Sequence, residues 1–348
     1  MNLGLLEELV RTPGVSGHET RVKKLLIEKM KGYVDEVNAD SFGNVSFRTK
    51  GNGGPRVMVC AHMDEIGLAV TRIDDNGYIR VIPIGYVDAR ILPGKKVIIY
   101  SADEEHESIP GIIGIKPIHF QKPEDAKREI SVSDLHIDIG CSSKEEVERL
   151  GIEPGSAICF EKLFDRLQND RLSGTSLDNR AGVYVMAEVA KAMQKPEADV
   201  YWVASCQEEV GLRGAKVAAF GIHPQLSIVL DVAIATDTPD LGTSFSEAKL
   251  GGGPIIVSID KGIITNRKLI NLVKSVAKKH NIPLQFVTVS AGRTDGAEVS
   301  VARAGVPTIQ ICLPLRYAHN PAEIVDLKDI IATVTLVKGV IEEFGNGW

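Results

Sequence analysis

Residues 179–206 read NRAGVYVMAEVAKAMQKPEADVYWVASC, and this stretch joins two different periodicities. Residues 179–194 repeat their apolar side chains at the spacing of an α-helix. Residues 199–206 form a nearly continuous apolar run of strand length, which is typical of a strand buried on both faces by helices. The stretch therefore predicts one helix–strand step of an α/β domain.

The same alternation extends in both directions from this stretch. Toward the N-terminus, helices are predicted at residues 2–11 and 19–33, and strands at residues 44–49 and 56–63. Toward the C-terminus, strands are predicted at residues 226–232, 254–260, 284–290 and 308–314, and helices at residues 215–221, 266–281, 298–305 and after residue 326. This rhythm predicts an α/β/α sandwich that is made from both ends of the chain.

The sequence pattern changes in the middle of the chain. Between about residues 70 and 165, short β-rich segments such as YIRVIPI and KKVIIYS are separated by the turn signals DDNG, LPGK and EPGS. Strands and turns at such close spacing predict a small all-β barrel or sandwich, with one short helix at residues 144–151 and a polar, mobile loop at residues 121–134. We therefore expect an α/β domain of residues 1–69 and 166–348, with a β domain of residues 70–165 inserted into it.

Composition narrows the class of protein. The 348 residues carry a formal net charge of −6 and no long basic run, which argues against a nucleic-acid partner because such a partner needs a basic face. No apolar stretch reaches the roughly 18 residues of a membrane span, and the N-terminus lacks the basic start of a signal peptide. The five cysteines lie far apart and mostly in apolar runs. We interpret them as reduced core residues and expect a cytoplasmic protein without a membrane partner.

Histidines and carboxylates follow several predicted strands, in the region where α/β sheets build their sites. His62 and Asp64 follow the apolar run VMVCA, and residues two apart in a strand point to the same side. Asp64 can therefore orient the His62 imidazole by accepting its second N–H, as carboxylates do for metal-bound histidines. A surface His–Asp pair is the alternative.

Four more carboxylates and a second histidine share this setting. Asp178 precedes a predicted helix, where an N-cap is the alternative role. Glu208 and Glu209 follow the strand DVYWVA, and on an extended segment they would point in opposite directions, one toward a metal and one toward a water or substrate. A solvated acidic turn is the alternative for this pair. Asp231 ends the apolar run LSIVLDV, where an unpaired carboxylate would be costly, and His319 follows another apolar strand.

Together, two histidines and three carboxylates with one spare glutamate form a mixed nitrogen and oxygen donor set. Such a set suits zinc, cobalt or manganese. A two-metal site would use one carboxylate as a bridge and give each ion one histidine and one terminal carboxylate. The spare glutamate would then take a proton from the bridging water and deliver it to the leaving amine.

Five segments, in this order along the chain, resemble the tetrahedral (TET) aminopeptidases: AHMDEIGL, SLDNRAG, CQEEVGLRGA, DVAIATDTP and LRYAHNPAEIVDL. This is metallopeptidase family forty-two, which includes glutamyl and deblocking aminopeptidases, and the likeness extends from TPGVSGHE at residue 12 to the final helix. The resemblance implies a dinuclear aminopeptidase that acts on peptides. It also implies a PDZ-like barrel for dimerisation, and dimers that assemble into a hollow homododecamer.

The resemblance assigns five positions to two divalent ions, zinc or cobalt, with manganese as a further candidate. His62 and Asp231 would hold one ion. Glu209 and His319 would hold the other, and Asp178 would bridge the two.

Two further positions match catalytic residues of the family, and two segments depart from its pattern. Glu208 corresponds to the general base, and Asp64 to the residue that orients the first histidine. Asn179 stands where the family often has aspartate, an isosteric change that leaves the bridge intact. The segment SAGRTDGAEVS differs from the family's glycine-rich GTDAxAI pattern by Arg293 and Glu298. Because this segment lies near the substrate pocket in relatives, Arg293 could favour acidic N-terminal residues, and a structural salt bridge is the alternative.

Three other functions remain as alternatives. Some relatives have been described as cellulases, but a glycoside hydrolase needs two flanking carboxylates and aromatic platforms, whereas aromatic residues make up only 5% of this chain and the histidines would have no role. Hydrolysis of blocked substrates such as acyl amino acids is a second alternative. A metal-binding scaffold without turnover is a third, and the presence of Glu208 argues against it.

Overall fold

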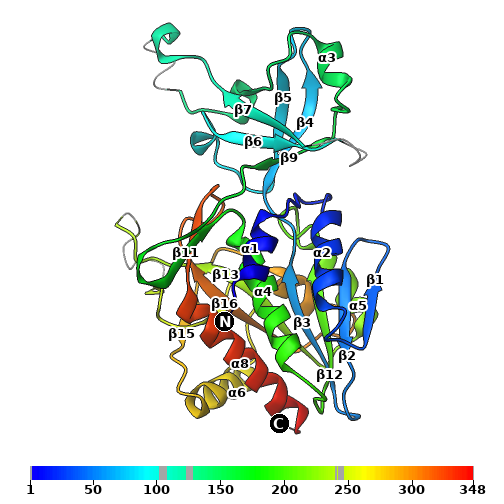
Figure 1. The fold of residues 1–348 in the computed structure, drawn as a ribbon. Helices are drawn as coiled ribbons and strands as arrows, with labels where there is room; N and C mark the ends of the chain where they lie inside the picture. Colours follow the sequence, from blue (N-terminus) through cyan, green and yellow to red (C-terminus); the bar gives the residue numbers. More distant parts are fainter. Residues whose placement is uncertain (1, 102–107, 123–127, 240, 242–246, 348) are drawn as a thin grey trace.

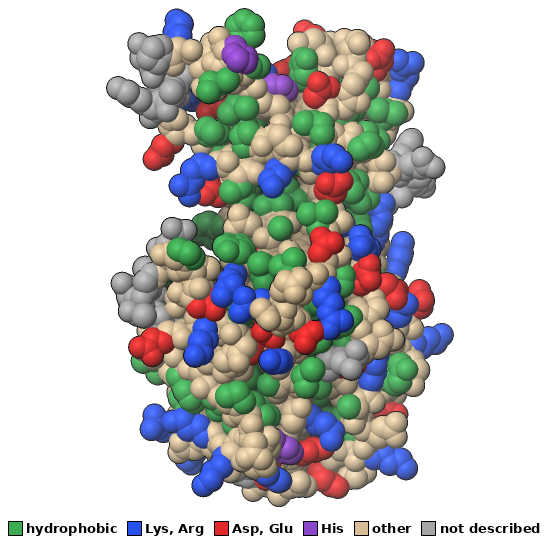
Figure 2. Space-filling model, turned by 60° about the vertical axis from the view of Figure 1, so that its left-hand side comes forward, with side chains coloured by type: hydrophobic (Ala, Val, Ile, Leu, Met, Phe, Trp, Pro, Cys, Tyr) green, Lys and Arg blue, Asp and Glu red, His purple; other side chains and the backbone are tan. Residues whose placement is uncertain are grey.

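The computed structural model describes residues 2–101, 108–122, 128–239, 241 and 247–347. An α/β unit lies below a small β-barrel in the view of Figure 1. Among the residues described, no helix combines the length and the apolar character needed to cross a membrane. On the face shown in Figure 2, acidic and basic side chains are interspersed, with apolar side chains exposed between them.

The α/β unit is built on an eight-stranded mixed sheet. In spatial order its strands are β1 (Glu36–Ala39), β2 (Val45–Thr49), β12 (Asp199–Ser205), β3 (Arg56–His62), β13 (Leu226–Ile234), β16 (Thr308–Leu315), β14 (Ile255–Ile259) and β15 (Gln285–Thr288). The four central strands β12, β3, β13 and β16 run parallel, whereas β2 and β14 pair antiparallel with their inner neighbours. The continuous apolar runs occupy these central strands because both of their faces are covered.

Helices cover both faces of the sheet. One face carries α1 (Gly4–Arg11), α2 (Thr20–Met30), α4 (Leu177–Ala192), α6 (Arg267–Lys279) and α8 (Leu327–Gly345), and the other carries α5 (Arg213–Ile222) and α7 (Asp295–Ser300). The larger core, on the side of α4, contains the fully buried Trp202 and Tyr184. The predicted α/β/α sandwich is confirmed.

The structure corrects the bounds of one predicted helix. The sequence pattern places it at residues 298–305, whereas α7 spans Asp295–Ser300. The helix begins earlier because Thr294 Oγ1 accepts the Gly296 N–H at 3.1 Å as an N-cap. It ends earlier because Arg303 and Gly305 have φ of +53° and +98°, which a right-handed helix does not allow.

The middle of the chain forms a closed six-stranded barrel, as predicted. Its strands, in spatial order, are β4 (Gly67–Ile73), β5 (Ile79–Ile84), β8 (His136–Asp138), β7 (Ile109–Gly114), β6 (Lys96–Ile99) and β9 (Ala157–Phe160). The barrel has its own apolar core, separate from the cores of the sheet, and the short helix α3 (Lys144–Glu148) lies where a helix was expected. Of the polar loop expected at residues 121–134, residues 123–127 lie outside the described residues and Val132–Asp134 form one 3₁₀ turn.

Three short strands that the sequence pattern does not predict form a second sheet. They are β10 (Phe164–Arg166), β11 (Arg171–Gly174) and β17 (Glu323–Asp326), with β11 in the middle. Segments of three or four residues are too short to show a strand period. This sheet places the segment before α8 beside the segment that leads into α4.

A buried charged cluster lies where the barrel joins the α/β unit. Glu65, between β3 and β4, is 1% exposed and accepts hydrogen bonds from the Gly14 N–H at 2.7 Å, from Lys162 Nζ and from Ser176 Oγ. Arg180, which is fully buried, places its Nη2 3.6 Å from Glu65 Oε1. Burial alone would raise the pKa of Glu65, but the two cations outweigh it and hold the pKa below its ordinary value.

Glu65→Ala should lower the free energy of unfolding by about 3–5 kcal/mol, because two buried cations lose their shared partner. Glu161→Ala is the matched control, since Glu161 lies on the connection that carries Lys162 but its side chain is 47% exposed and 3.5 Å from Lys96. Its loss should cost less than about 1 kcal/mol. Guanidinium unfolding of both variants measures the difference, and equal losses would show that the buried cluster does not hold this junction.

Candidate metal centre

Three strands of the large sheet bring candidate ligands to one edge. β3 ends at His62, β13 carries Asp231 toward its carboxyl end, and the turn after β12 carries Glu208 and Glu209. Because these strands run parallel, the register places His62 directly beside Ser205, the last residue of β12. The carboxyl edge of the sheet, where α/β folds bind ligands, therefore gathers four of the predicted site residues.

Asp178 reaches the same place from the start of α4. Its backbone is extended, with φ −75° and ψ 103°, so it does not continue the helix. The capping role falls to Asn179 instead, whose Oδ1 accepts the Gly182 N–H at 3.1 Å and whose Nδ2 donates to the Leu230 carbonyl at 2.8 Å. The Asp178 carboxylate is therefore free to face the two histidines, which an N-cap would not be.

The distances join five predicted ligands into one cluster. His62 Nε2 lies 3.2 Å from Asp178 Oδ1 and 3.7 Å from Asp231 Oδ1. His319 Nε2 lies 3.5 Å from Asp178 Oδ2 and 3.5 Å from Glu209 Oε2. The two oxygens of Asp178 thus face different imidazoles, and each imidazole has one further carboxylate.

This spacing fits divalent ions bound by nitrogen and oxygen. With bonds of about 2.0–2.1 Å, two ligand atoms on a tetrahedral zinc ion are about 3.3–3.4 Å apart. The four separations within the cluster, from 3.2 to 3.7 Å, lie close to that edge length. Two overlapping groups of donors, His62 with Glu208 and Asp231 and His62 with Asp178 and Glu209, each lie within 4.8 Å.

Both imidazoles are oriented by an acceptor on their other nitrogen. His62 Nδ1 lies 3.4 Å from Asp64 Oδ1 and 3.2 Å from the Asp64 carbonyl, as expected from their spacing in sequence. His319 Nδ1 lies 3.1 Å from the carbonyl of Tyr86, a residue of the barrel segment that follows β5. The Tyr86 ring stacks on the His319 ring with the centroids 6.4 Å apart. Sequence analysis missed Tyr86, because a backbone carbonyl has no residue signature.

Asp64 also holds the acidic turn in place. Its carboxylate accepts the N–H of Glu208 at 3.0 Å, the N–H of Glu209 at 3.1 Å and the hydroxyl of Ser16 at 2.6 Å. The segment is not extended, since Gln207 has a positive φ of 56° and the N–H groups at positions 211 and 212 close a turn on the Glu208 carbonyl. Both glutamates therefore point into the cluster, and a solvated acidic turn is wrong for Glu209, which is 8% exposed.

The cluster contains more carboxyl groups than histidines, so the histidines cannot balance the charge of all the carboxylates. Burial, and then the Asp178 charge, raise the pKa of Glu209 to about 8. Burial opposes a charged His319, but the hydrogen bond to Asp178 and the Glu209 charge raise its pKa to about 9. Burial holds the pKa of Glu208 well above its ordinary value, although the side chain is partly exposed. Without metal, the cluster therefore keeps protons at neutral pH that bound cations would displace.

Metal binding should release more than one proton per subunit near neutral pH, and metal affinity should rise with pH. At pH below about 8, both Glu209 and His319 hold protons in the metal-free chain, so a cation must displace them, and acid strengthens this competition. Zinc titration of chelator-treated protein by calorimetry, in buffers of different ionisation enthalpy, counts the protons. An affinity that stayed constant from about pH 6 to pH 9 would contradict this account.

Arg293 lies in an ion pair outside this cluster. Its Nη2 is 3.0 Å from Glu298 Oε1, and Lys216 Nζ is 2.7 Å from Glu298 Oε2. The Arg293 side chain remains 47% exposed. The structure therefore shows the salt bridge that the sequence left as an alternative, while a role in substrate selection stays a prediction.

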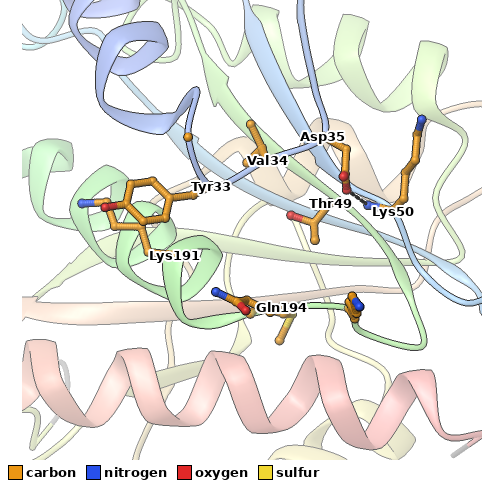
Figure 3. A pocket seen from close by; sticks show the side chains of 10 residues that line it. Tyr33, Val34, Asp35, Thr49, Lys50, Lys191 and Gln194 are labelled. Atoms are coloured by element: carbon orange, nitrogen blue, oxygen red, sulfur yellow. Dashed lines mark hydrogen bonds between the residues drawn. The ribbon is translucent and has the colours of Figure 1, made fainter.

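A pocket of about 330 Å³ lies at the opposite end of the sheet from the metal cluster. Its lining includes Tyr33 and Asp35 between α2 and β1, Thr49 at the end of β2, and Lys191 and Gln194 at the end of α4 (Figure 3). These residues adjoin the strand ends that point away from the carboxyl edge. No member of the metal cluster lines this pocket, so the candidate chemistry lies elsewhere.

The chain therefore combines an α/β/α sandwich with a cluster of histidine and carboxylate side chains at the carboxyl edge of its sheet. The profile of the M42 glutamyl aminopeptidases matches residues 43–336. The chain is 39% identical to the lysyl aminopeptidase of Pyrococcus furiosus over 342 residues, which are 97% of this chain and 96% of that protein. The chain belongs to the M42 glutamyl aminopeptidase family and is a peptidase.

Two solved structures share the whole architecture. An aminopeptidase from the archaeon Desulfurococcus kamchatkensis superposes with a TM-score of 0.93 at 39% identity, covering 98% of this chain and 94% of its own. The TET1 peptidase of Pyrococcus horikoshii, described as assembling into a tetrahedron or a large octahedral shell, gives 0.88 at 33% identity and covers 98% and 99% of the two chains. The expected resemblance to the TET aminopeptidases is therefore confirmed.

Proposed function

We propose that this chain is a dinuclear metal-dependent aminopeptidase that releases N-terminal residues from peptides. His62 and Asp231 would hold one ion, His319 and Glu209 the second, and Asp178 would bridge them. The position of Asp178 carries this proposal, because its two oxygens face different imidazoles at 3.2 and 3.5 Å. A carboxylate whose oxygens face different imidazoles can span two ions, one beside each imidazole.

When bound, the ions would acidify a shared water and polarise the scissile carbonyl. Glu208 would carry out the proton transfers as general base and then general acid. Its carboxylate lies within 4.8 Å of the ligand atoms of His62 and Asp231, so it can reach a water held in the cluster. A carboxylate at that distance can accept a proton from the water and later return it to the leaving amine.

Zinc or cobalt is the proposed native metal, with manganese as the further candidate. The two imidazole nitrogens favour these borderline ions over magnesium and calcium, which prefer oxygen ligands alone. Peptidases of this family are metal-dependent, and the described residues of this chain contain the acidic and histidine groups that such ions require.

We further propose that residues 70–165 form a dimerisation domain inserted into a catalytic domain of residues 1–69 and 166–348, and that dimers assemble into a homododecamer. The barrel side of the molecule exposes large apolar residues, among them Ile118 at 76% and Phe120 at 75%. Apolar side chains that are exposed together on a surface often mark a protein–protein interface. Multi-angle light scattering tests the assembly, and a stable monomer or dimer at working concentration would contradict the homododecamer.

A panel of aminoacyl p-nitroanilides, assayed with cobalt or zinc and with or without EDTA, tests the proposed activity. We expect metal-dependent release from at least one side-chain class and none after chelation. N-acetylated anilides and carboxymethyl cellulose, run in parallel, represent the blocked-substrate and glycosidase alternatives. Release from none of the free-amine substrates would contradict an aminopeptidase.

Arg293→Ala should raise KM for a glutamyl anilide by about tenfold or more and leave a leucyl anilide nearly unchanged, if the half-exposed guanidinium binds an acidic N-terminal side chain. A hydrogen bond to a charged group is worth about 1.5–3 kcal/mol. Lys216→Ala is the matched control, since it removes the other cation beside Glu298. If the ratio of KM for the glutamyl anilide to KM for the leucyl anilide were the same in both variants and the parent, the role of Arg293 would be limited to its salt bridge.

A further inference from the structure

Glu323 joins two candidate metal ligands through their backbones. Glu323 is the first residue of β17 and is only 2% exposed. Glu323 Oε2 accepts the backbone N–H of Asp178 at 2.9 Å, and Oε1 accepts the backbone N–H of His319 at 3.0 Å. One carboxylate therefore holds the proposed bridging ligand and one terminal ligand, which come from distant parts of the sequence.

The small sheet brings this carboxylate to its place. Glu323 pairs with Gly174 of β11, and the chain continues from there toward Asp178. On its other side, residues 316 and 324 form an isolated antiparallel bridge, with both backbone hydrogen bonds present at 3.0 and 3.1 Å. This bridge closes a short loop that carries His319 and ends at Glu323, so Glu323 lies where this loop meets β11, the strand that leads into α4.

Both ligand backbones need an acceptor from outside their own element. His319 has a φ of +60°, and Asp178 has an extended conformation at the point where α4 begins. The Asp178 N–H lies in the first turn of α4, where N–H groups have no acceptor within the helix, and His319 lies in a loop outside the helices and strands. A buried N–H without an acceptor is costly. Asp64 meets the same need on the other side of the cluster, where it accepts the N–H groups of Glu208 and Glu209.

We propose that Glu323 is a positioning residue that sets the separation of Asp178 and His319, and thereby the affinity and geometry of the ion between them. This inference rests on the proposed dinuclear site. Glu323 does not touch the reacting atoms in this account, since both of its oxygens are engaged by backbone amides. Loss of such supporting contacts typically weakens metal binding by about 10–100-fold.

Glu323→Gln is the first variant to test, because glutamine keeps the shape but can accept only one of the two N–H groups. Asp326→Asn is the matched control: Asp326 lies on the same strand, is 5% exposed, and accepts a backbone N–H from Lys328 at 2.9 Å, away from the cluster. Cobalt is titrated into chelator-treated protein, and affinity, stoichiometry and the visible absorption spectrum are recorded with the melting temperature.

We expect Glu323→Gln to weaken one of two cobalt sites by about 10–100-fold and to change the visible spectrum, and Asp326→Asn to do neither. Glu323→Ala should weaken cobalt binding at that site more than Glu323→Gln does. Wild-type affinity and spectrum in Glu323→Gln, even with a lower melting temperature, would overturn the inference and leave Glu323 a purely structural residue. A parent chain that bound no cobalt, or a single ion, would overturn the proposed dinuclear site itself.

Discussion

Glu208→Gln should lower kcat on an aminoacyl p-nitroanilide by about 10²–10⁴-fold, which is the range that a positioned general acid–base contributes. Glutamine preserves the size of the side chain and the backbone hydrogen bond to Asp64, but it cannot accept a proton. KM and the metal content should change little, because the ions are proposed to be held by other residues. A loss confined to kcat is the signature of an interaction made in the transition state.

The measurement is steady-state kinetics on protein whose metal content is determined by atomic absorption. Glu161→Gln is the control, since it makes the same chemical change on a half-exposed residue of the connection after the barrel. Near-normal turnover of Glu208→Gln with its ions bound would mean that another group takes the proton. A loss of ions from Glu208→Gln would instead make Glu208 a ligand, which its place beside His62 and Asp231 also permits.

Removal of the ions should abolish peptidase activity, by more than about 10³-fold, and their return should restore it. In the metal-free cluster Glu209 and His319 hold protons at neutral pH, and no Lewis acid is present to polarise the carbonyl. The fold should survive, because the two largest apolar cores lie in the helix-covered sheet and in the barrel rather than in the cluster. Circular dichroism and activity, measured before and after chelation, separate the two effects.

Asp178→Ala tests the same metal dependence at the proposed bridging residue. Loss of the proposed bridge should remove tight binding of both ions, whereas Asp326→Asn should leave both. Zinc at about 100 times its dissociation constant should stabilise the parent by about 2.7 kcal/mol and Asp178→Ala by much less. Activity that persisted in chelated protein with a trace metal content would contradict a metal mechanism, whatever the variants did.

The sequence pointed to the side chains that meet in this cluster because each lies at a place with a recognisable local pattern. Asp231 and His62 end apolar runs, and such runs become central strands whose carboxyl ends meet at one edge. The barrel was predictable for a related reason, since strands and turns alternate at close spacing there. The ligand roles themselves still depend on the metal and kinetic experiments above.

Other features had no local pattern to find. Tyr86 offers its backbone carbonyl to His319, and Glu323 accepts hydrogen bonds from two backbone amides. Neither side-chain identity nor sequence spacing predicts contacts of this kind. The spacing of Arg293 and Glu298 in the sequence did not decide whether their side chains meet, and the structure places them 3.0 Å apart. Glu208 and Glu209 were expected on an extended segment because they follow a strand, but Asp64 bends that segment into a turn.

By itself, the sequence determined the longer helices and strands and the chemical types at their ends, because periodicity and side-chain chemistry are local properties. The tertiary structure alone decided which backbone groups support those side chains, how the short strands β10, β11 and β17 pair, and where the barrel contacts the metal cluster. These contacts join residues far apart along the chain. Their free energy arises only when the whole fold brings a buried donor and its acceptor together, and a buried group without such a partner would be costly.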